Sequence, residues 1–242
     1  MNRYYLPAPS WEGETLRLSG EEARHATRVM RVQVGEQIEI FDGCGKAAVC
    51  TVTHTERQSV DCEIQSEQNH PAPQFPITLC QSIPKGGNME LIVQKAVELG
   101  VNTIQPLITQ RTVARPDSLA KKQEKWQRIA LEACKQCGQN YLPEIATPLH
   151  FQPWLTELTP FGTAIIASLD ERAVHLRKHL EKSPLTGNIG LLIGPEGDFS
   201  PEEYQHAYDA GFHPISFGEI VMRVETASIY GLSVIQHERS FL

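Results

Sequence analysis

The sequence predicts an α/β protein in which a small all-β domain precedes a larger domain built on a mostly parallel sheet. Two observations predict this class. Short β-branched stretches separated by turn residues fill positions 1–65, and beyond them apolar runs alternate with longer helical patterns. Strands that alternate with helices favour a parallel sheet with helices on both faces.

The first domain is predicted to contain short strands at 36–41, 47–55 and 59–64. Segment 65–76 then carries three prolines and almost no apolar pattern, which indicates a linker. We therefore place the two domains at 1–72 and 73–242. In the second domain, strands are predicted at 77–83, 103–108, 163–169, 188–194 and 214–217, and helices at 89–100, 118–138, 171–182, from Ser200 onward and at 225–238.

Composition and charge exclude several classes of protein. The chain has a formal net charge of -7, and no apolar run approaches the roughly 18 residues that a membrane span requires. The first residues lack the apolar core of a signal peptide, so we expect a cytoplasmic protein that does not bind a membrane. In that compartment the six cysteines are expected to be free thiols. The acidic total hides a basic segment at 109–135, which is either a solvated helix face or a surface for nucleic acid.

The apolar run at 188–194 ends in a loop, Gly194-Pro195-Glu196-Gly197-Asp198, and a helix follows. Ser200 is the predicted N-cap, Pro201 occupies the first helical position and Glu203 completes a capping box. Ligands of open α/β sheets bind at such strand-to-helix junctions. The loop is not a P-loop, because it lacks Gly-Lys-Ser/Thr and its carboxylates would repel phosphate. It is either a simple turn or a cradle for a ligand that is cationic or rich in hydroxyls and amines.

A second strand end lies close by in the sequence. The strand at 214–217 ends before Gly218, and an irregular segment leads to the helix that opens at Glu225. Two strand-end loops so close together favour one shared pocket. Arg223 and Glu225 either face this pocket or form an ordinary ion pair with each other.

Four motifs occur in order along nearly the whole chain: RHATRVMRVQVGEQIEIFDGCGK, GGNMELIVQKAVELGV, LLIGPEGDFSPEE and SFGEIVMRVETA. Together they resemble the bacterial small-subunit ribosomal RNA uridine-N3 methyltransferases, a family of the SPOUT, or α/β-knot, superfamily. The resemblance implies a PUA-like β-barrel for RNA, a SPOUT-type α/β domain with a deep trefoil knot, and a homodimer. It also implies methylation of N3 of a uridine in 16S ribosomal RNA, or in the small ribosomal subunit, with S-adenosyl-L-methionine as the methyl donor.

The resemblance further implies the residues of the site. Cofactor-binding positions fall in three loops, at Leu169, Ile193, Gly194, Pro195, Glu196, Gly197, Phe217, Gly218, Val221, Met222 and Arg223. We expect Arg223 to supply positive charge near the reacting base, and Glu225 and Thr226 to fix the loop and the helix start. The implied RNA-binding positions are Arg3, Arg24, His25, Arg28, Arg31 and Lys85, several of which a short helix would present together.

The chain departs from the pattern of that family at four positions. Ile220, Gln139 and Tyr141 stand where arginines are usual, and Asp198 stands where glycine is usual. The missing arginines leave a second function open, that of a non-catalytic RNA-binding or ribosome-assembly factor.

A third function, a nucleotide-dependent oxidoreductase, depends on the stretch GCGKAA at 43–48. This stretch matches a dinucleotide fingerprint, but alternating β-branched residues follow it where a helix is required, so we interpret it as a hairpin turn. Cys134 and Cys137 have no second CxxC pair, and we expect no metal site.

Overall fold

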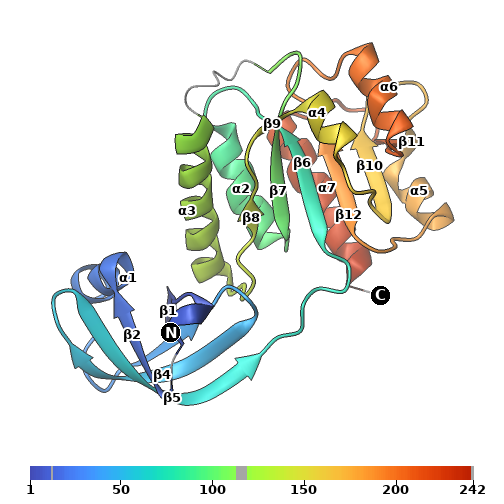
Figure 1. The fold of residues 1–242 in the computed structure, drawn as a ribbon. Coiled ribbons are helices and arrows are strands. Elements are labelled where there is room, and N and C mark those ends of the chain that lie inside the picture. Colours follow the sequence, from blue (N-terminus) through green and yellow to red (C-terminus); the bar gives the residue numbers. More distant parts are fainter. Residues whose placement is uncertain (12, 113–118, 241–242) are drawn as a thin grey trace. The chain divides into compact units, whose positions relative to one another are not determined.

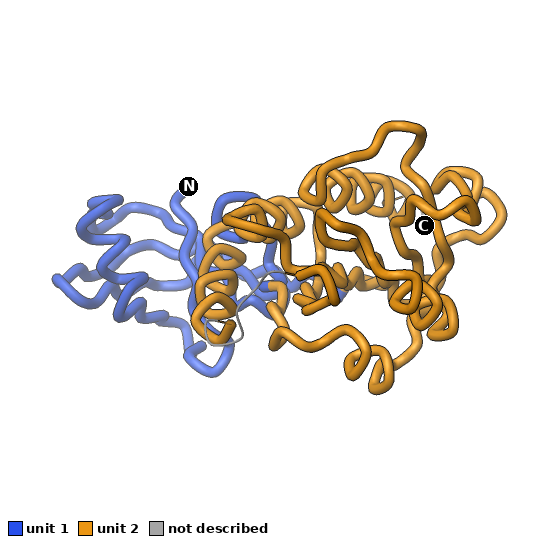
Figure 2. Tube along the Cα trace, turned by 90° about the horizontal axis from the view of Figure 1, so that it is seen from above, with its two compact units in different colours: residues 1–72, 134–142 blue, residues 73–133, 143–242 orange. Residues whose placement is uncertain are grey.

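The computed structural model describes residues 1–11, 13–112 and 119–240. The chain forms two compact units, which Figure 2 shows in different colours. Unit 1 comprises Met1–Ala72 and Cys134–Leu142, and unit 2 comprises Pro73–Ala133 and Pro143–Leu242. The short segment Cys134–Leu142 thus groups with the N-terminal residues, although the sequence pattern assigns it to the second domain.

Unit 1 is built on a five-stranded sheet in the order β1-β3-β4-β5-β2 (Figure 1). β1 pairs parallel with β3, and the other neighbours pair antiparallel. Alternate side chains of the two longest strands, such as Val52 and Cys62, are buried in one core, as the two-residue period of a strand requires. The strands are β1 (Asn2–Tyr5), β2 (Thr15–Ser19), β3 (Gln37–Phe41), β4 (Lys46–Thr55) and β5 (Ser59–Asn69).

The connection between β3 and β4 is a hairpin. Gly43 and Gly45 in this turn have φ values of 77° and 106°, which side chains disfavour. The antiparallel register of the two strands confirms the hairpin predicted at 43–48 and provides no helix for a pyrophosphate. A Cβ on Gly45 would collide with the hydroxyl of Tyr141, which donates a hydrogen bond to the carbonyl of His70 (2.9 Å). Tyr141 is therefore part of the packing of unit 1.

Unit 2 contains an eight-stranded sheet in the order β11-β13-β10-β12-β6-β7-β8, with β9 also paired to β7. Every strand pair in the described part of this sheet is parallel, which confirms the predicted sheet type. All five residues of β12 are buried, as expected of a central parallel strand. The strands are β6 (Ile77–Ser82), β7 (Thr103–Ile108), β8 (Glu144–Ile145), β9 (Leu149–His150), β10 (Thr163–Ala167), β11 (Val174–His175), β12 (Ile189–Ile193) and β13 (His213–Ser216).

Helices cover both faces of this sheet. Leu192 of β12 belongs to a buried cluster with residues of α4 and α6, whereas the neighbouring Leu191 contacts Gly231 of α7. Because successive side chains of a strand point to opposite faces, α4 and α6 lie on one face and α7 on the other. α2 packs against α7. The helices are α2 (Asn88–Glu98), α3 (Leu119–Cys137), α4 (Phe151–Thr156), α5 (Leu176–Lys182), α6 (Pro201–Asp209) and α7 (Val224–Arg239).

The helix predicted at 171–182 begins later than expected. The side chain of Asp170 accepts a hydrogen bond from the backbone N of Arg172 (2.8 Å), and its carbonyl accepts one from Ala173 (2.9 Å). This turn feeds the short strand β11, so α5 starts only at Leu176. None of the helices in the described ranges is long and apolar enough to cross a membrane. The trefoil knot stays a prediction.

Candidate active site and RNA-binding residues

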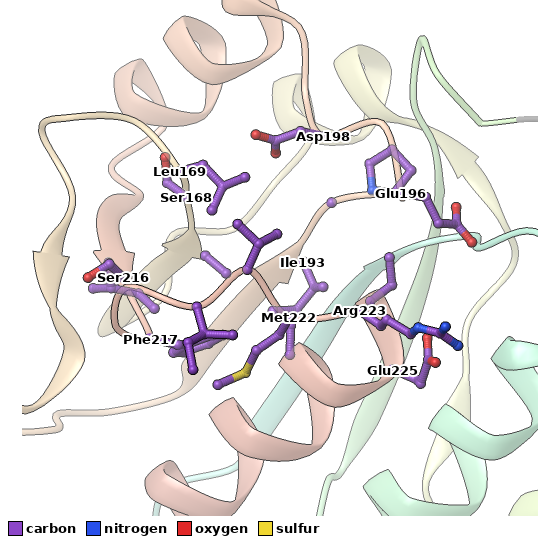
Figure 3. Close-up of a pocket in the computed structure, with 18 of the residues that line it drawn as sticks. Ser168, Leu169, Ile193, Glu196, Asp198, Ser216, Phe217, Met222, Arg223 and Glu225 are labelled. Carbon is purple, nitrogen blue, oxygen red and sulfur yellow. The ribbon is translucent and has the colours of Figure 1, made fainter.

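Unit 2 has a cavity of about 460 Å³, which Figure 3 shows in close-up. Three loops line it, and they follow β10, β12 and β13. These three strands are neighbours in the sheet and run parallel, so their carboxyl ends meet at one edge. The first turn of α7 and Asn88 at the start of α2 complete the wall. The two strand-end loops that the sequence places close together therefore share one cavity.

The glycine loop, residues 194–198, is a tight turn in which the backbone N of Asp198 donates to the carbonyl of Pro195 (2.9 Å). A side chain at Gly194 would be tightly packed, because a Cβ there would lie 3.0 Å from the buried ring of Phe199. Gly194 also lines the cavity, and as a glycine it exposes main chain there without a side chain of its own.

The helix beyond the glycine loop begins with the predicted capping box. Ser200 Oγ accepts a hydrogen bond from the backbone N of Glu203 (3.2 Å), and the Glu203 carboxylate accepts one from the backbone N of Ser200 (2.9 Å). Glu203 also accepts from the backbone N of Gln110 (2.8 Å). The cap therefore ties the start of α6 to the turn that follows β7.

Two further loops hold the glycine loop from outside. The guanidinium of Arg111 donates to the carbonyl of Gly197, and a Cβ on Gly197 would lie 3.1 Å from Arg111 Cδ. The backbone N of Lys85 donates to Glu196 Oε1 (2.8 Å). Gly197 is thus covered by Arg111 and does not line the cavity. The sequence showed Arg111 only as one charge of the basic segment.

The third loop, residues 217–223, gives the cavity an apolar wall. The ring of Phe217 packs edge-on against Tyr230 of α7, with 5.1 Å between the ring centroids. Gly218 has φ 121°, a conformation that side chains rarely adopt. Ile220 and Val221 are 82% and 68% exposed and leave aliphatic surface at the cavity.

The start of α7 carries the residues predicted to be catalytic. Arg223 is the N-cap residue of α7, and its exposed side chain makes no ion pair within the described part of the chain. Glu225 accepts a hydrogen bond from Asn88 Nδ2 (3.3 Å). The ordinary ion pair between Arg223 and Glu225 is therefore not formed among the described residues. Thr226 is exposed and lies outside the cavity lining.

The structure brings nearly all of the predicted cofactor-binding positions together. Those that line the cavity are Leu169, Ile193, Gly194, Pro195, Glu196, Phe217, Gly218, Val221, Met222 and Arg223. Sequence reasoning missed several other lining residues, among them Asn88, Ser168, Asp198 and Ser216. Their position at or just beyond strand ends was the only signal for most of them, whereas Asp198 stood inside the glycine loop itself.

The charges around the cavity are mainly negative. Glu196, Asp198 and Glu225 supply three carboxylates, and Arg223 supplies one guanidinium. The hydroxyl of Tyr204 donates to Asp198 Oδ1 (2.7 Å). Burial, and then this contact with Asp198, raise the pKa of Tyr204, so its hydroxyl stays protonated as a donor. The cavity is consequently suited to a ligand that carries positive charge.

Among the predicted RNA-binding residues, Arg3 is occupied by groups of unit 1. Its side chain is 7% exposed and pairs with Glu39 Oε1 at 3.0 Å. The guanidinium also donates to the carbonyls of Cys134 (2.7 Å) and Gln139 (2.9 Å). It lies 4.3 Å from the ring centroid of Phe41. These contacts give Arg3 a structural role in joining segment 134–142 to β1 and β3.

Three other predicted arginines are exposed at the same end of the sequence. Helix α1 (Gly20–Arg24) continues into a π-helix, η2 (His25–Val29), so Arg24 and Arg28 lie on one helical stretch. Arg31 follows this stretch and has φ 54°, outside the short helix expected to carry it. All three arginines are exposed to solvent.

The remaining predicted positions differ in their surroundings. His25 is half-buried, and its Nδ1 finds no hydrogen-bond partner among the described residues. Lys85 is an exposed residue of unit 2 in the loop after β6. In the basic segment at 109–135, Arg115 lies outside the described residues.

Comparison with known proteins extends these observations to a family. A model described as an RNA methyltransferase domain matches residues 70–236, and one described as an RNA methyltransferase PUA domain matches residues 18–65. The chain is 34% identical to ribosomal RNA small subunit methyltransferase E of Synechocystis sp., over 91% of this chain and 72% of the relative. The protein of the same name from Aquifex aeolicus is 32% identical, over 93% of this chain and 95% of the relative.

A solved structure agrees with the sequence matches. The crystal structure of a ribosomal RNA small subunit methyltransferase E from Neisseria gonorrhoeae, bound to S-adenosyl methionine, is 35% identical to this chain. It superposes with a TM-score of 0.88 and covers 98% of this chain and 97% of that one. These matches confirm the predicted class, an α/β domain with a mostly parallel sheet preceded by a PUA-like sheet. The chain belongs to the family of ribosomal RNA small subunit methyltransferase E.

Proposed function

We propose that this chain methylates N3 of a uridine in 16S ribosomal RNA of the small subunit, with S-adenosyl-L-methionine as the methyl donor. The observation that carries the proposal is the cavity at the carboxyl edge of β10, β12 and β13, where three loops converge. Family membership supports an RNA substrate. The uridine and its N3 atom rest on the resemblance of the four sequence motifs. Because ribosomal RNA is the substrate, we place the enzyme in the cytoplasm.

The cavity suits this donor in size, shape and charge. Its volume of about 460 Å³ lies within the range of about 300–1,000 Å³ that small-molecule sites occupy. Gly194 and Gly218 let the main chain approach a ligand, and three carboxylates against one guanidinium favour a net positive charge. When bound, S-adenosyl-L-methionine supplies a methyl group activated by a sulfonium sulfur. The Neisseria gonorrhoeae relative was solved with this molecule.

Arg223 is the residue to which we assign stabilisation of the reacting base. N3 of uridine is a weak acid on the Watson-Crick edge, so the base must be unpaired and must lose its N3 proton before N3 can be methylated. The exposed guanidinium of Arg223 is free of ion pairs within the described ranges and lines the cavity. It can therefore stabilise the negative charge that develops on the base.

Glu225 and Thr226 support Arg223 from the first turn of α7. The contact of Glu225 with Asn88 joins this turn to the start of α2, which keeps the N-cap residue Arg223 at the cavity wall. Thr226 is exposed beside them, so we limit its role to the helix start.

We assign RNA binding to the exposed arginines of unit 1, Arg24, Arg28 and Arg31, and to Lys85 of unit 2. Arg3 is left out of the RNA-binding residues because its donors already bind Glu39 and main-chain carbonyls. His25 stays in the proposal only as the neighbour of Arg24 on the same helical stretch, because its unpaired Nδ1 is buried. We also propose a homodimer, on the resemblance to the family.

A second candidate function is a non-catalytic RNA-binding or ribosome-assembly factor. One observation favours it: Ile220 is 82% exposed at the cavity, at a position where the resemblance implies an arginine. An aliphatic side chain there provides no positive charge for a phosphate or for the reacting base.

Two measurements separate these functions. Isothermal titration with S-adenosyl-L-methionine tests whether the cavity binds the donor at all, and an assembly factor without catalysis need not bind it. Mass spectrometry of nucleosides from 16S ribosomal RNA then compares cells with and without the gene. We expect one N3-methyluridine to disappear on deletion and to return with the wild-type gene but not with Arg223→Ala. An unchanged set of modified nucleosides after deletion would favour the assembly factor.

A further inference from the structure

Asp198 occupies a backbone conformation that glycine usually fills. Its φ is 63°, and Arg31 is the only other non-glycine residue with positive φ in the described ranges. Aspartate is one of the few residues that tolerate this region, because its short side chain can hydrogen-bond to nearby main chain. Asp198 does so here, since its Oδ1 accepts a hydrogen bond from the backbone N of Phe199 (2.9 Å). The side chain thereby fixes a turn that glycine would only permit.

The same oxygen of Asp198 is held by a second donor. Oδ1 accepts from the hydroxyl of Tyr204 (2.7 Å), a residue of α6 that is 7% exposed. The ring of Tyr204 is fixed in turn, with its centroid 5.4 Å from that of Phe199 and 5.8 Å from that of Tyr208. Two donors on one oxygen, one of them on a packed ring, keep the carboxylate of Asp198 in a single orientation.

The other oxygen of Asp198 remains available. Oδ2 accepts no hydrogen bond from any described residue, and Asp198 lines the cavity. In Figure 3 the carboxylate points toward the side of the cavity where Ser168 and Leu169 are labelled. Asp198 is half-buried, whereas Glu196 of the same loop is exposed and accepts from Lys85. Solvent therefore screens the negative charge of Asp198 in the cavity less than it screens the charge of Glu196.

We infer that Asp198 is a specificity-determining residue that makes the cavity prefer S-adenosyl-L-methionine over its demethylated product, S-adenosylhomocysteine. The inference rests on the proposed function. The two molecules share their adenosine, amino and carboxylate groups, and they differ in one methyl group and in the positive charge on sulfur. A fixed carboxylate stabilises the charged sulfonium and gains nothing from the neutral sulfide. Loss of the charge on methyl transfer therefore weakens binding and favours release of the product.

The test is isothermal titration of both molecules into the wild-type chain of residues 1–242 and into the variants Asp198→Asn and Tyr204→Phe. Asparagine keeps an Oδ1 acceptor for Phe199 and Tyr204 and removes only the charge. We expect Asp198→Asn to weaken S-adenosyl-L-methionine about tenfold and S-adenosylhomocysteine less than twofold, so the ratio of the two dissociation constants changes. Thermal melting verifies that the variants are folded.

Tyr204→Phe is the matched control. It removes the hydroxyl that holds Asp198 and retains the charge, so it should lower the melting temperature and shift the ratio of dissociation constants less than Asp198→Asn does. Asp198→Gly keeps the left-handed turn and should shift the ratio as Asp198→Asn does. Equal weakening of both ligands by Asp198→Asn, or no weakening of either, would overturn the inference and leave the proposed function standing. Failure of the wild-type chain to bind either ligand would overturn the proposed function itself.

Discussion

Alanine at Gly194 should disturb the glycine loop far more than alanine at Gly197. Neither glycine has positive φ, so alanine introduces no backbone strain at either position. A Cβ at Gly194 would lie 3.0 and 3.1 Å from two ring atoms of Phe199. That ring is 3% exposed and lies 5.4 Å from the rings of both Phe151 and Tyr204, measured between centroids. The ring must therefore shift by a few tenths of an ångström against packed neighbours.

The expected loss of stability depends on which atom the new Cβ displaces. Overpacking a core in this manner costs about 1–3 kcal/mol, which corresponds to a fall of about 2–12 °C in melting temperature for a chain of this size. At Gly197 the nearest atom, 3.1 Å away, is Cδ of Arg111, an exposed and flexible side chain. Displacing it sacrifices a hydrogen bond at the surface, worth about 1 kcal/mol or less.

The assay compares the two variants by thermal melting and by isothermal titration with S-adenosyl-L-methionine. We expect Gly194→Ala to lower both the melting temperature and the affinity, because a displaced Phe199 also displaces the loop beside the cavity. Gly197→Ala should stay close to wild type in affinity, since residue 197 does not line the cavity. Equal effects of the two substitutions, or a larger effect at Gly197, would refute the reasoning that core packing holds this loop.

Substitutions at four other residues probe the assigned roles. Arg223→Ala should reduce kcat about a hundredfold and change the dissociation constant of S-adenosyl-L-methionine less than twofold. Arg223→Lys, which keeps the positive charge, should restore part of the rate. Steady-state kinetics measures kcat, and isothermal titration measures the dissociation constant. Arg24→Ala and Arg28→Ala should each make the fall of log affinity for 16S ribosomal RNA with log salt concentration less steep, by about 1 in the slope. An unchanged slope would show that the residue does not contact an RNA phosphate. Arg3→Ala should destabilise unit 1 by about 2–4 kcal/mol, seen in thermal melting, and leave that slope unchanged, because its guanidinium is 7% exposed and binds Glu39 and two main-chain carbonyls of the same unit.

The elements that could be predicted from sequence are those whose causes are local. The uninterrupted apolar run of β12 indicates a strand buried on both faces, and the structure buries all five of its residues. The capping box of Ser200 and Glu203 depends on residues three apart, so a short stretch of sequence contains all of its partners. These two features together position the glycine loop, and therefore the centre of the candidate site.

The start of α5 shows where a local pattern misleads. The apolar spacing at 171–182 indicates a helix along its whole length, but Asp170 uses its carboxylate and carbonyl to close a turn over Arg172 and Ala173. Val174 then pairs with Ile215 in β13, which a helix would prevent. An aspartate before a helical pattern can cap a turn as readily as a helix, and the sequence contains no signal that decides between them.

Arg3 and Gly197 could not be placed from sequence because their partners are distant along the chain. Arg3 binds carbonyls at positions 134 and 139, and Gly197 is covered by Arg111. A basic residue near a terminus and a glycine in a loop have the same appearance in a sequence whether they serve a ligand or the fold. Only the tertiary contacts separate the two cases, and here the contacts of Arg3 and Gly197 among the described residues are with other parts of the fold. Arg223 is the one arginine among the described residues that lines the cavity, and it has no ion-pair partner there, so its charge is available for a substrate.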